Sequence, residues 1–173
     1  MHPHEESDLH AAVAACDVEE VKDLLGRGPT FDSRTHFSMT PLMLAAQLGY
    51  DEIVGILVDA GQKLDVKSRV NSFGGGLTAL HFAAERGRLR ACQILLKAGA
   101  NPNVASADKM TALNYAIHDK NEAVVQCLLE NGADPNGSKT CRETPLVSAV
   151  SLKQVPILRT VNSTRQPKHP WCQ

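Results

Sequence analysis

Residues 78–103 read TALHFAAERGRLRACQILLKAGANPN and carry the clearest structural pattern in the chain. Thr78 is a favourable N-terminal residue for a helix, because its hydroxyl can accept a hydrogen bond from a free backbone N–H of the first turn. Leu80 and Ala84 follow at helical spacing, so they share one face. The small alanine lets a second helix approach closely. Gly87 is predicted to end this first helix.

A second amphipathic helix is predicted directly after this glycine. Its apolar face is carried by Leu89, Cys92, Leu95 and Leu96. Gly99 is predicted to end it. Helices this short are marginal in water on their own, so each must bury its apolar face against neighbouring units. The stretch therefore predicts one helix–turn–helix unit in a stack of similar units.

The same unit recurs along the chain at a nearly constant spacing. Thr111 begins TALNYAI 33 positions after Thr78, and Thr144 begins TPLVSAV 33 positions further on. In the other direction Thr40 begins TPLMLAA 38 positions before Thr78, so the intervening unit carries 5 extra residues. Ser7 begins SDLHAAV 33 positions before Thr40. The sequence thus predicts five units, starting near residues 7, 40, 78, 111 and 144.

The period of 33 and the T-P-L-H-x-A type of motif resemble the ankyrin repeat. The resemblance covers roughly residues 7–155. It implies an all-α fold, an ankyrin-type solenoid of stacked helix–turn–helix repeats with hairpin loops. It also implies a structural role for His81, which would bond between adjacent turns. We predict a polar N-terminal lead over residues 1–6, an ankyrin repeat domain over residues 7–162 and a disordered tail over residues 163–173.

The fifth unit departs from the pattern after its first helix. Residues 155–162 stand where a second helix is expected, and Ile157 and Leu158 keep an apolar stripe. Thr160 and Asn162, however, occupy positions that are apolar in the preceding unit, and no glycine follows. Two alternatives remain at this point: a polar capping helix, or a repeat that is cut short and replaced.

Charge and composition exclude several classes of partner. The chain of 173 residues has 18 Lys plus Arg against 19 Asp plus Glu, a formal net charge of −1. This balance gives no general attraction to nucleic acid or to an anionic membrane. No apolar run approaches the roughly 18 residues of a transmembrane helix, and the N-terminal MHPHEESDLH does not read as a secretory signal. We expect a cytoplasmic protein, with access to the nucleus.

One group of basic residues needs separate consideration as a nucleic-acid site. It consists of Lys67, Arg69, Arg86, Arg88, Arg90 and Lys97. A nucleic-acid interface needs a continuous basic stripe. Here Glu85 and the balanced overall charge dilute the positive charge, so we expect no nucleic-acid partner.

No catalytic or metal-binding set is recognisable in the sequence. The patterns H-E-x-x-H, G-x-S-x-G and C-x-x-C are absent, and the 5 cysteines lack metal-ligand spacing. Cys92 and Cys127 stand where other units place core aliphatics, which predicts buried, reduced thiols. We therefore expect no enzymatic activity, no cofactor, no metal and no small-molecule substrate.

The residues predicted to contact a partner follow from the repeat positions. Stacked repeats form an extended concave surface, and in ankyrin-like proteins partners dock on the hairpin tips and on the exposed face of the first helices. The tip residue before each central threonine is apolar: Met39, Leu77 or Met110, with Phe37 nearby. The matching first-helix positions hold Gln47, Leu48, Glu85, Arg86, His118 and Asp119. An apolar strip with a polar border is typical of a protein interface; the alternative is that the tip side chains fold back over the helix starts.

These observations predict a non-catalytic protein–protein interaction module. It would act as a monomer and bind a protein partner through the concave hairpin and first-helix surface. The alternative is a purely structural repeat segment, or a truncated form of a larger ankyrin-repeat scaffold or adaptor.

Overall fold

The computed structural model of this chain describes residues 8–28, 39–69, 75–137, 144–151 and 156–159. Within these ranges the secondary structure is helical, with turns and no strand. The helices are α1 (Asp8–Ala14), α2 (Val18–Gly26), α3 (Pro41–Leu48), α4 (Asp51–Asp59), α5 (Ala79–Glu85), α6 (Leu89–Lys97), α7 (Ala112–His118), α8 (Glu122–Glu130) and α9 (Pro145–Ser151). Residues 156–159 form a further short helical segment. The predicted all-α class is confirmed.

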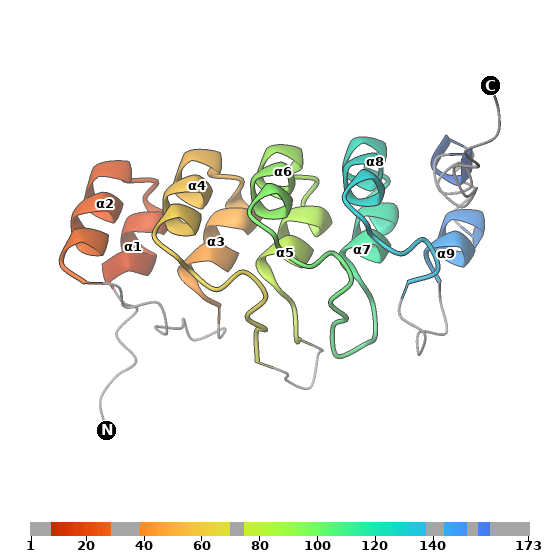
Figure 1. The fold of residues 1–173 in the computed structure, drawn as a ribbon, viewed down its shortest axis with the longest axis horizontal. Coiled ribbons are helices and arrows are strands. Elements are labelled where there is room, and N and C mark those ends of the chain that lie inside the picture. The colour runs from red at the N-terminus through yellow and green to blue at the C-terminus, as the bar shows by residue number, and fades with distance from the viewer. Residues whose placement is uncertain (1–7, 29–38, 70–74, 138–143, 152–155, 160–173) are drawn as a thin grey trace, which may run out of the picture.

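The helices are arranged in two rows (Figure 1). The first helices of the units, α1, α3, α5, α7 and α9, lie side by side in one row, and α2, α4, α6 and α8 lie in a second row above it. Four first helices, α1, α3, α5 and α7, each pack against the second helix of their own unit and against the first helix of the next unit. The fifth, α9, packs against α7. The described parts of the loops before α5 and α7 project beyond the first row (Figure 1). The chain is therefore a solenoid of stacked helix–turn–helix units.

The first helices begin where the motif predicts. Four of them start at the residue after Thr40, Thr78, Thr111 and Thr144. At Thr40 the side-chain hydroxyl accepts a hydrogen bond from the Met43 backbone N–H at 3.3 Å. Pro41 occupies the first helical position, where a missing N–H costs nothing. The threonine therefore supplies the bond that an isolated helix start would lack.

A residue in the left-handed backbone conformation joins the two helices within each of units 1 to 4. Units 2 and 3 use Gly49 and Gly87, with φ of 80° and 64°, a region that glycine adopts without steric cost. Units 1 and 4 have Cys16 and Lys120 at this place, both with φ of 58°. A residue with a Cβ is strained there by about 1–2 kcal/mol. The sequence of units 1 and 4 is thus less well matched to the turn.

The hydrophobic core runs along the stack between the two rows. Leu80 on α5 and Leu95 on α6 are fully buried, as their apolar stripes predict. Cys92 is fully buried and Cys127 is nearly so, which confirms the prediction of core thiols. Small residues such as Ala83, fully buried on α5, allow close packing between neighbouring first helices.

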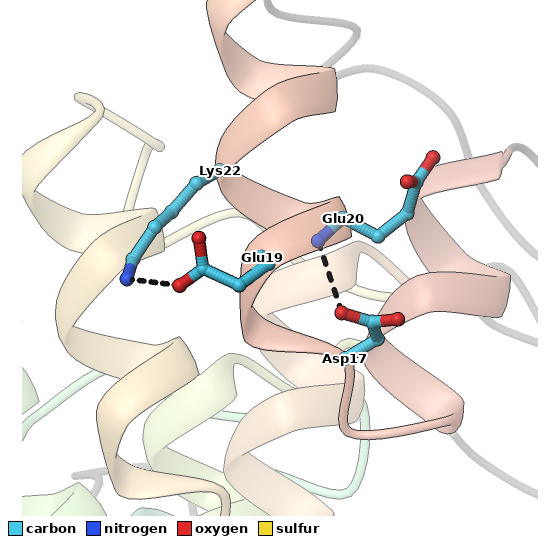
Figure 2. Close-up of polar contacts among 4 residues, drawn as sticks. All are labelled: Asp17, Glu19, Glu20 and Lys22. Carbon is cyan, nitrogen blue, oxygen red and sulfur yellow. Dashed lines mark hydrogen bonds and ion pairs between the residues drawn. The ribbon is translucent and has the colours of Figure 1, made fainter.

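The second helix of unit 1 carries a charged outer surface (Figure 2). The Asp17 carboxylate accepts a hydrogen bond from the Glu20 backbone N–H at 3.0 Å and so caps the N-terminus of α2. The Lys22 ammonium donates to the Glu19 carboxylate at 2.9 Å. Both side chains of this ion pair are exposed, so the pair contributes little to stability. The helix is held by its cap and by buried Val21 rather than by surface charges.

The exposure of α9 differs from that of the earlier first helices. Val147 and Val150 occupy the repeat positions of Asn114 and Ile117 one unit earlier. α9 packs against α7, and both of those α7 residues are 0% exposed. Val147 and Val150 are 48% and 58% exposed. We infer that side chains at these two repeat positions are buried only where the first helix of a following unit packs over them.

The predicted second helix of the fifth unit is described only in part. Residues 156–159 are helical, and Ile157 is buried, in agreement with the apolar stripe. Residues 155 and 160–162 lie outside the described ranges, as do the predicted lead over 1–6 and the predicted tail over 163–173. The choice between a polar cap and a replaced repeat concerns these residues.

Candidate functional site

Serine side chains close the hairpin loops that carry two of the predicted tip residues. In the loop before α7, the Ser106 N–H donates to the Met110 carbonyl at 2.8 Å, and the Met110 N–H donates to the Ser106 hydroxyl at 3.2 Å. Ser68 and Leu77 make the same pair of bonds in the preceding loop, at 2.8 Å and 3.0 Å. The backbones of both tip residues are therefore held by the same pair of hydrogen bonds to a serine.

Buried histidines connect two of the tips to the preceding units. The His10 Nε2 lies 2.9 Å from the Met39 carbonyl, and the His81 Nε2 lies 3.3 Å from the Met110 carbonyl. The Thr78 N–H donates to His81 Nδ1 at 3.1 Å, so the ring proton belongs on Nε2, which donates to the carbonyl. Burial lowers the pKa of His81 to about 4 and keeps the ring neutral near neutral pH. The structural role that the resemblance implies for His81 agrees with these contacts.

The three apolar tip side chains have different surroundings. Met39, Leu77 and Met110 are all partly buried. Met39 and Leu77 pack against the hydrophobic core. Met110 instead lines an open depression on the surface. Phe37 lies outside the described residues.

This depression has a volume of about 450 Å³ and lies between units 3 and 4. It is lined by Glu85, Met110, Tyr115, His118 and Asp119. Glu85 is the last residue of α5, Met110 is the tip residue before α7, and the other three lie on α7 or directly after it. The first helices and one hairpin tip thus form its wall together.

Tyr115 is held in place by the histidine beneath it. The two rings meet edge to face, with their centroids 5.6 Å apart and an interplanar angle of 84°. This geometry is a favourable one for aromatic rings. Burial raises the pKa of Tyr115, a hydrogen bond with Ser106 opposes the shift, and the nearby charges of Asp108 and Glu85 raise it further. The phenol is therefore protonated and can donate a hydrogen bond.

The structure brings together four of the predicted site residues and separates the others. Glu85, Met110, His118 and Asp119 line the depression. Arg86 is exposed beside it, and its Nε lies 3.9 Å from the Glu85 carboxylate. Gln47 and Leu48 are half-buried one unit away, where the Gln47 carbonyl accepts a long hydrogen bond of 3.4 Å from Arg88.

Sequence reasoning missed Tyr115. It stands three residues before His118 on the same helix, and residues at this spacing share a face. This spacing, together with the polar tip of a tyrosine, is the signal that points to the site. What the spacing does not reveal is the edge-to-face contact with the ring of the preceding unit.

In the described residues the possible metal ligands are not clustered, and the two core cysteines are un-ionised. No group of three or more His, Cys, Asp or Glu is placed to hold a metal ion within those ranges. Burial raises the pKa of the Cys92 thiol to about 12 and also raises that of Cys127. Both cysteines are therefore thiols rather than nucleophilic thiolates at neutral pH.

The family assignment follows from the repeat geometry together with sequence comparison. A family model described as ankyrin repeats in three copies matches residues 9–106 and, a second time, residues 98–165. The chain belongs to the ankyrin repeat family. Ankyrin repeats as a class mediate protein–protein interaction and are typically not enzymes. The expected fold and family are thereby both confirmed.

Several curated proteins are similar to part of this ankyrin chain. The ankyrin repeat, SAM and basic leucine zipper domain-containing protein 1 of Notamacropus eugenii is 35% identical over 94 residues, or 54% of this chain. The nuclear factor NF-kappa-B p105 subunit of Rattus norvegicus is 33% identical over 98 residues, or 57%. The neurogenic locus notch homolog protein 1 of Cricetulus griseus is 35% identical over 98 residues, or 56%. The matched regions span only 20%, 10% and 4% of these relatives.

None of the described helices is long and apolar enough to cross a membrane. The tertiary contacts of this ankyrin chain, within the same ranges, join helices of one continuous stack.

Proposed function

We propose that this chain is a non-catalytic protein-interaction module that binds a protein partner through the concave surface of its hairpin tips and first helices. The observation that carries the proposal is the depression lined by Glu85, Met110, Tyr115, His118 and Asp119. It joins residues of two consecutive units and of a hairpin tip in one recess. A partner side chain that enters it contacts three different segments of the stack at once.

The composition of the depression supports protein recognition. Methionine and tyrosine are enriched at protein interfaces, where a few central residues supply most of the binding energy. Tyr115 is preoriented by its contact with His81, so less side-chain freedom is lost when a partner binds. Met110 adapts its flexible side chain to partners of different shape. The polar side chains around these two residues provide a solvated border.

The experiment is affinity capture from lysate with cross-linking and mass spectrometry, followed by titration of the recovered partner. Met110→Ser and His118→Ala change residues that line the depression, and Gln93→Ser changes an exposed residue of α6 as a matched control. We expect the first two variants to weaken binding by about tenfold or more and the control to bind normally. All three must melt like the unchanged protein. Equal capture by all variants would show that the depression is not the binding site.

A purely structural segment is the second candidate. It is favoured by the small share of the relatives that the matched region covers, at most 20%. This candidate predicts that substitutions on the hairpin surface alter melting alone and that no protein is captured specifically. Titration and melting of the same variants therefore separate the two candidates.

We further propose that the chain is monomeric, cytoplasmic with access to the nucleus, and without a nucleic-acid partner. The last point is supported by the net charge of −1. Light scattering checks the mass in solution, and imaging of a tagged chain checks its location. Retention on heparin or nucleic-acid resin near 150 mM salt would contradict the exclusion of nucleic acid, because such binding depends on cationic surfaces.

A further inference from the structure

The depression beside α7 has a definite electrostatic character. Its lining contains the carboxylates of Glu85 and Asp119, the Tyr115 ring, the Met110 thioether and the His118 imidazole, and neither lysine nor arginine. An acidic recess with an aromatic wall differs from a general apolar groove. It selects among partner side chains by charge as well as by shape.

The groups around the Tyr115 phenol also indicate a negative electrostatic environment at the depression. Burial is the main cause that raises the pKa of Tyr115, and the charges of Asp108 and Glu85 raise it further. Asp108 lies in the hairpin before α7 and does not line the depression. Acidic side chains from two separate segments therefore act on the same ring.

The two carboxylates are weakly engaged within the molecule. Glu85 has the Arg86 Nε at 3.9 Å, and these side chains are 41% and 55% exposed. An exposed contact of this length contributes little and leaves the carboxylate open to a better partner. For Asp119, the described part of the chain supplies no ion pair. Both charges are thus available to a group that enters from outside.

We propose that this depression receives a cationic side chain, of arginine or lysine, from the protein partner. The cation lies against the face of Tyr115 and pairs with the carboxylates of Glu85 and Asp119, while Met110 packs against its aliphatic stem. Cations bind favourably over aromatic faces, and charge-assisted hydrogen bonds to carboxylates are the stronger kind. The inference rests on the proposed function, because it assigns the partner chemistry of that same surface.

Other side chains fit the recess less well. An apolar side chain would remove the carboxylates from water without giving them a partner, which is costly. An acidic side chain would meet like charges. The volume of about 450 Å³ is large enough for one long side chain.

The test uses five-residue peptides, acetylated and amidated, with two alanines on each side of a central residue. The central residue is arginine, lysine, citrulline or norleucine; the last two copy the shape of the cationic side chains without their charge. Binding is followed by the shifts of backbone amide signals of the ¹⁵N-labelled full chain. We expect the arginine or the lysine peptide to shift signals around Met110, Tyr115 and Asp119, and to bind about tenfold or more tightly than its neutral counterpart. Equal binding of charged and neutral peptides, or no shifts with either cation, would overturn the proposal.

Two double variants that each remove two negative charges test whether the preference for the cationic peptide arises at the depression. The double variant Glu85→Gln, Asp119→Asn removes two charges from the depression. The double variant Glu52→Gln, Glu122→Gln removes two charges from exposed sites on α4 and α8. We expect the first to abolish the preference for the cationic peptide and the second to retain it. Loss of the preference in both would assign it to overall charge and contradict a local site.

The outcome is separable from that of the proposed function. If the peptides show no charge preference while Met110→Ser still weakens capture of a protein partner, the cationic ligand is wrong and the binding surface stands. If the charge preference is found but no substitution in the depression affects a captured partner, the site binds cations and the proposed function fails.

Discussion

The imidazole of His81 and the phenol ring of Tyr115 meet edge to face, with their centroids 5.6 Å apart. One ring lies in the core of unit 3, and the other lines the depression formed with unit 4. The same imidazole is 3.3 Å from the carbonyl of Met110, a second lining residue. The core of one unit therefore orients two groups of the candidate site on the next, and substitutions of His81 are expected to affect both stability and binding.

The first prediction concerns the pH dependence of folding. The pKa of His81 is about 4 in the folded chain because the ring is buried, well below the ordinary histidine value of about 6.5. Below pH 6.5 the unfolded chain takes up a proton that the folded chain does not. The free energy of unfolding therefore falls as the pH drops from about 6.5 to about 4, by on the order of 3 kcal/mol. Urea titrations at several pH values measure this slope.

The matched control for this prediction is His81→Asn. In unit 4 the residue at this position is Asn114, whose side-chain oxygen accepts the Thr111 N–H at 3.0 Å. The asparagine thus keeps the hydrogen bond at the helix start and removes the titrating ring. The variant should lose a large part of the slope between pH 6.5 and 4. An unchanged slope would mean that other groups cause it.

The second prediction concerns the core. Leu95 is fully buried on α6, and Leu95→Ala should lower the free energy of unfolding by about 2–5 kcal/mol, because the removed side chain leaves a cavity. Gln93→Ala changes an exposed residue of the same helix and should stay within about 0.5 kcal/mol. Chemical denaturation compares the two. A Leu95→Ala variant that unfolds like its parent would refute the helix register.

The third prediction concerns the turn inside the units. Lys120 has φ of 58° and is exposed. Lys120→Gly should raise the free energy of unfolding by about 0.5–1 kcal/mol, because the relief of backbone strain exceeds the flexibility that glycine adds to the unfolded chain. Thermal melting should show a higher midpoint. A lower midpoint would mean that the side chain contributes more than the strain removes.

The reverse substitution, Gly87→Ala, is the matched counterpart at the same turn of unit 3. Its φ is 64°, and a Cβ there would overlap the side-chain amide of Asn121. The oxygen of that side chain caps α8 by accepting the Val124 N–H at 3.1 Å. We expect a loss of about 1–3 kcal/mol from strain and a disturbed cap.

The fourth prediction compares one repeat position in two units. Ile117→Ser removes a fully buried side chain and should destabilise by at least about 3 kcal/mol. Val150, at the same position one unit later, is 58% exposed, so Val150→Ser should stay within about 0.5 kcal/mol. Parallel denaturant titrations provide the measurement. Similar losses in both variants would indicate that Val150 is covered in solution.

Much of the fold could be predicted because the same residue pattern recurs in several successive units. The period of 33 places the helix starts, and the apolar stripes identify Leu80 and Leu95 as core. The exposure of side chains in the last described unit could not be predicted in this way. By repeat position alone, Val147 and Val150 would be assigned to the core. Their exposure depends on what packs over them, which a position within one unit does not encode.

The candidate site could be predicted only in part. Four of its lining residues were predicted from their repeat positions. The orientation of the fifth, Tyr115, depends on a ring contact with His81, a histidine 34 positions earlier. The shared tip position also suggests that Met39, Leu77 and Met110 are equivalent, although their surroundings differ. Such differences arise from side chains on adjacent units, and a motif within one unit does not contain them.

The last prediction separates these three tip residues. Met39 and Leu77 pack against the core, so Met39→Ser and Leu77→Ser should each lower the free energy of unfolding by about 1–3 kcal/mol. Met110 lines the open depression, so Met110→Ser should change stability by about 0.5 kcal/mol or less and weaken partner binding. Each variant is measured by denaturant titration and by partner titration at a temperature where all are folded. If Met110→Ser instead unfolds the chain while binding per folded molecule is unchanged, Met110 is a core residue, and the interface has to be sought on the first-helix face around Arg86 and His118.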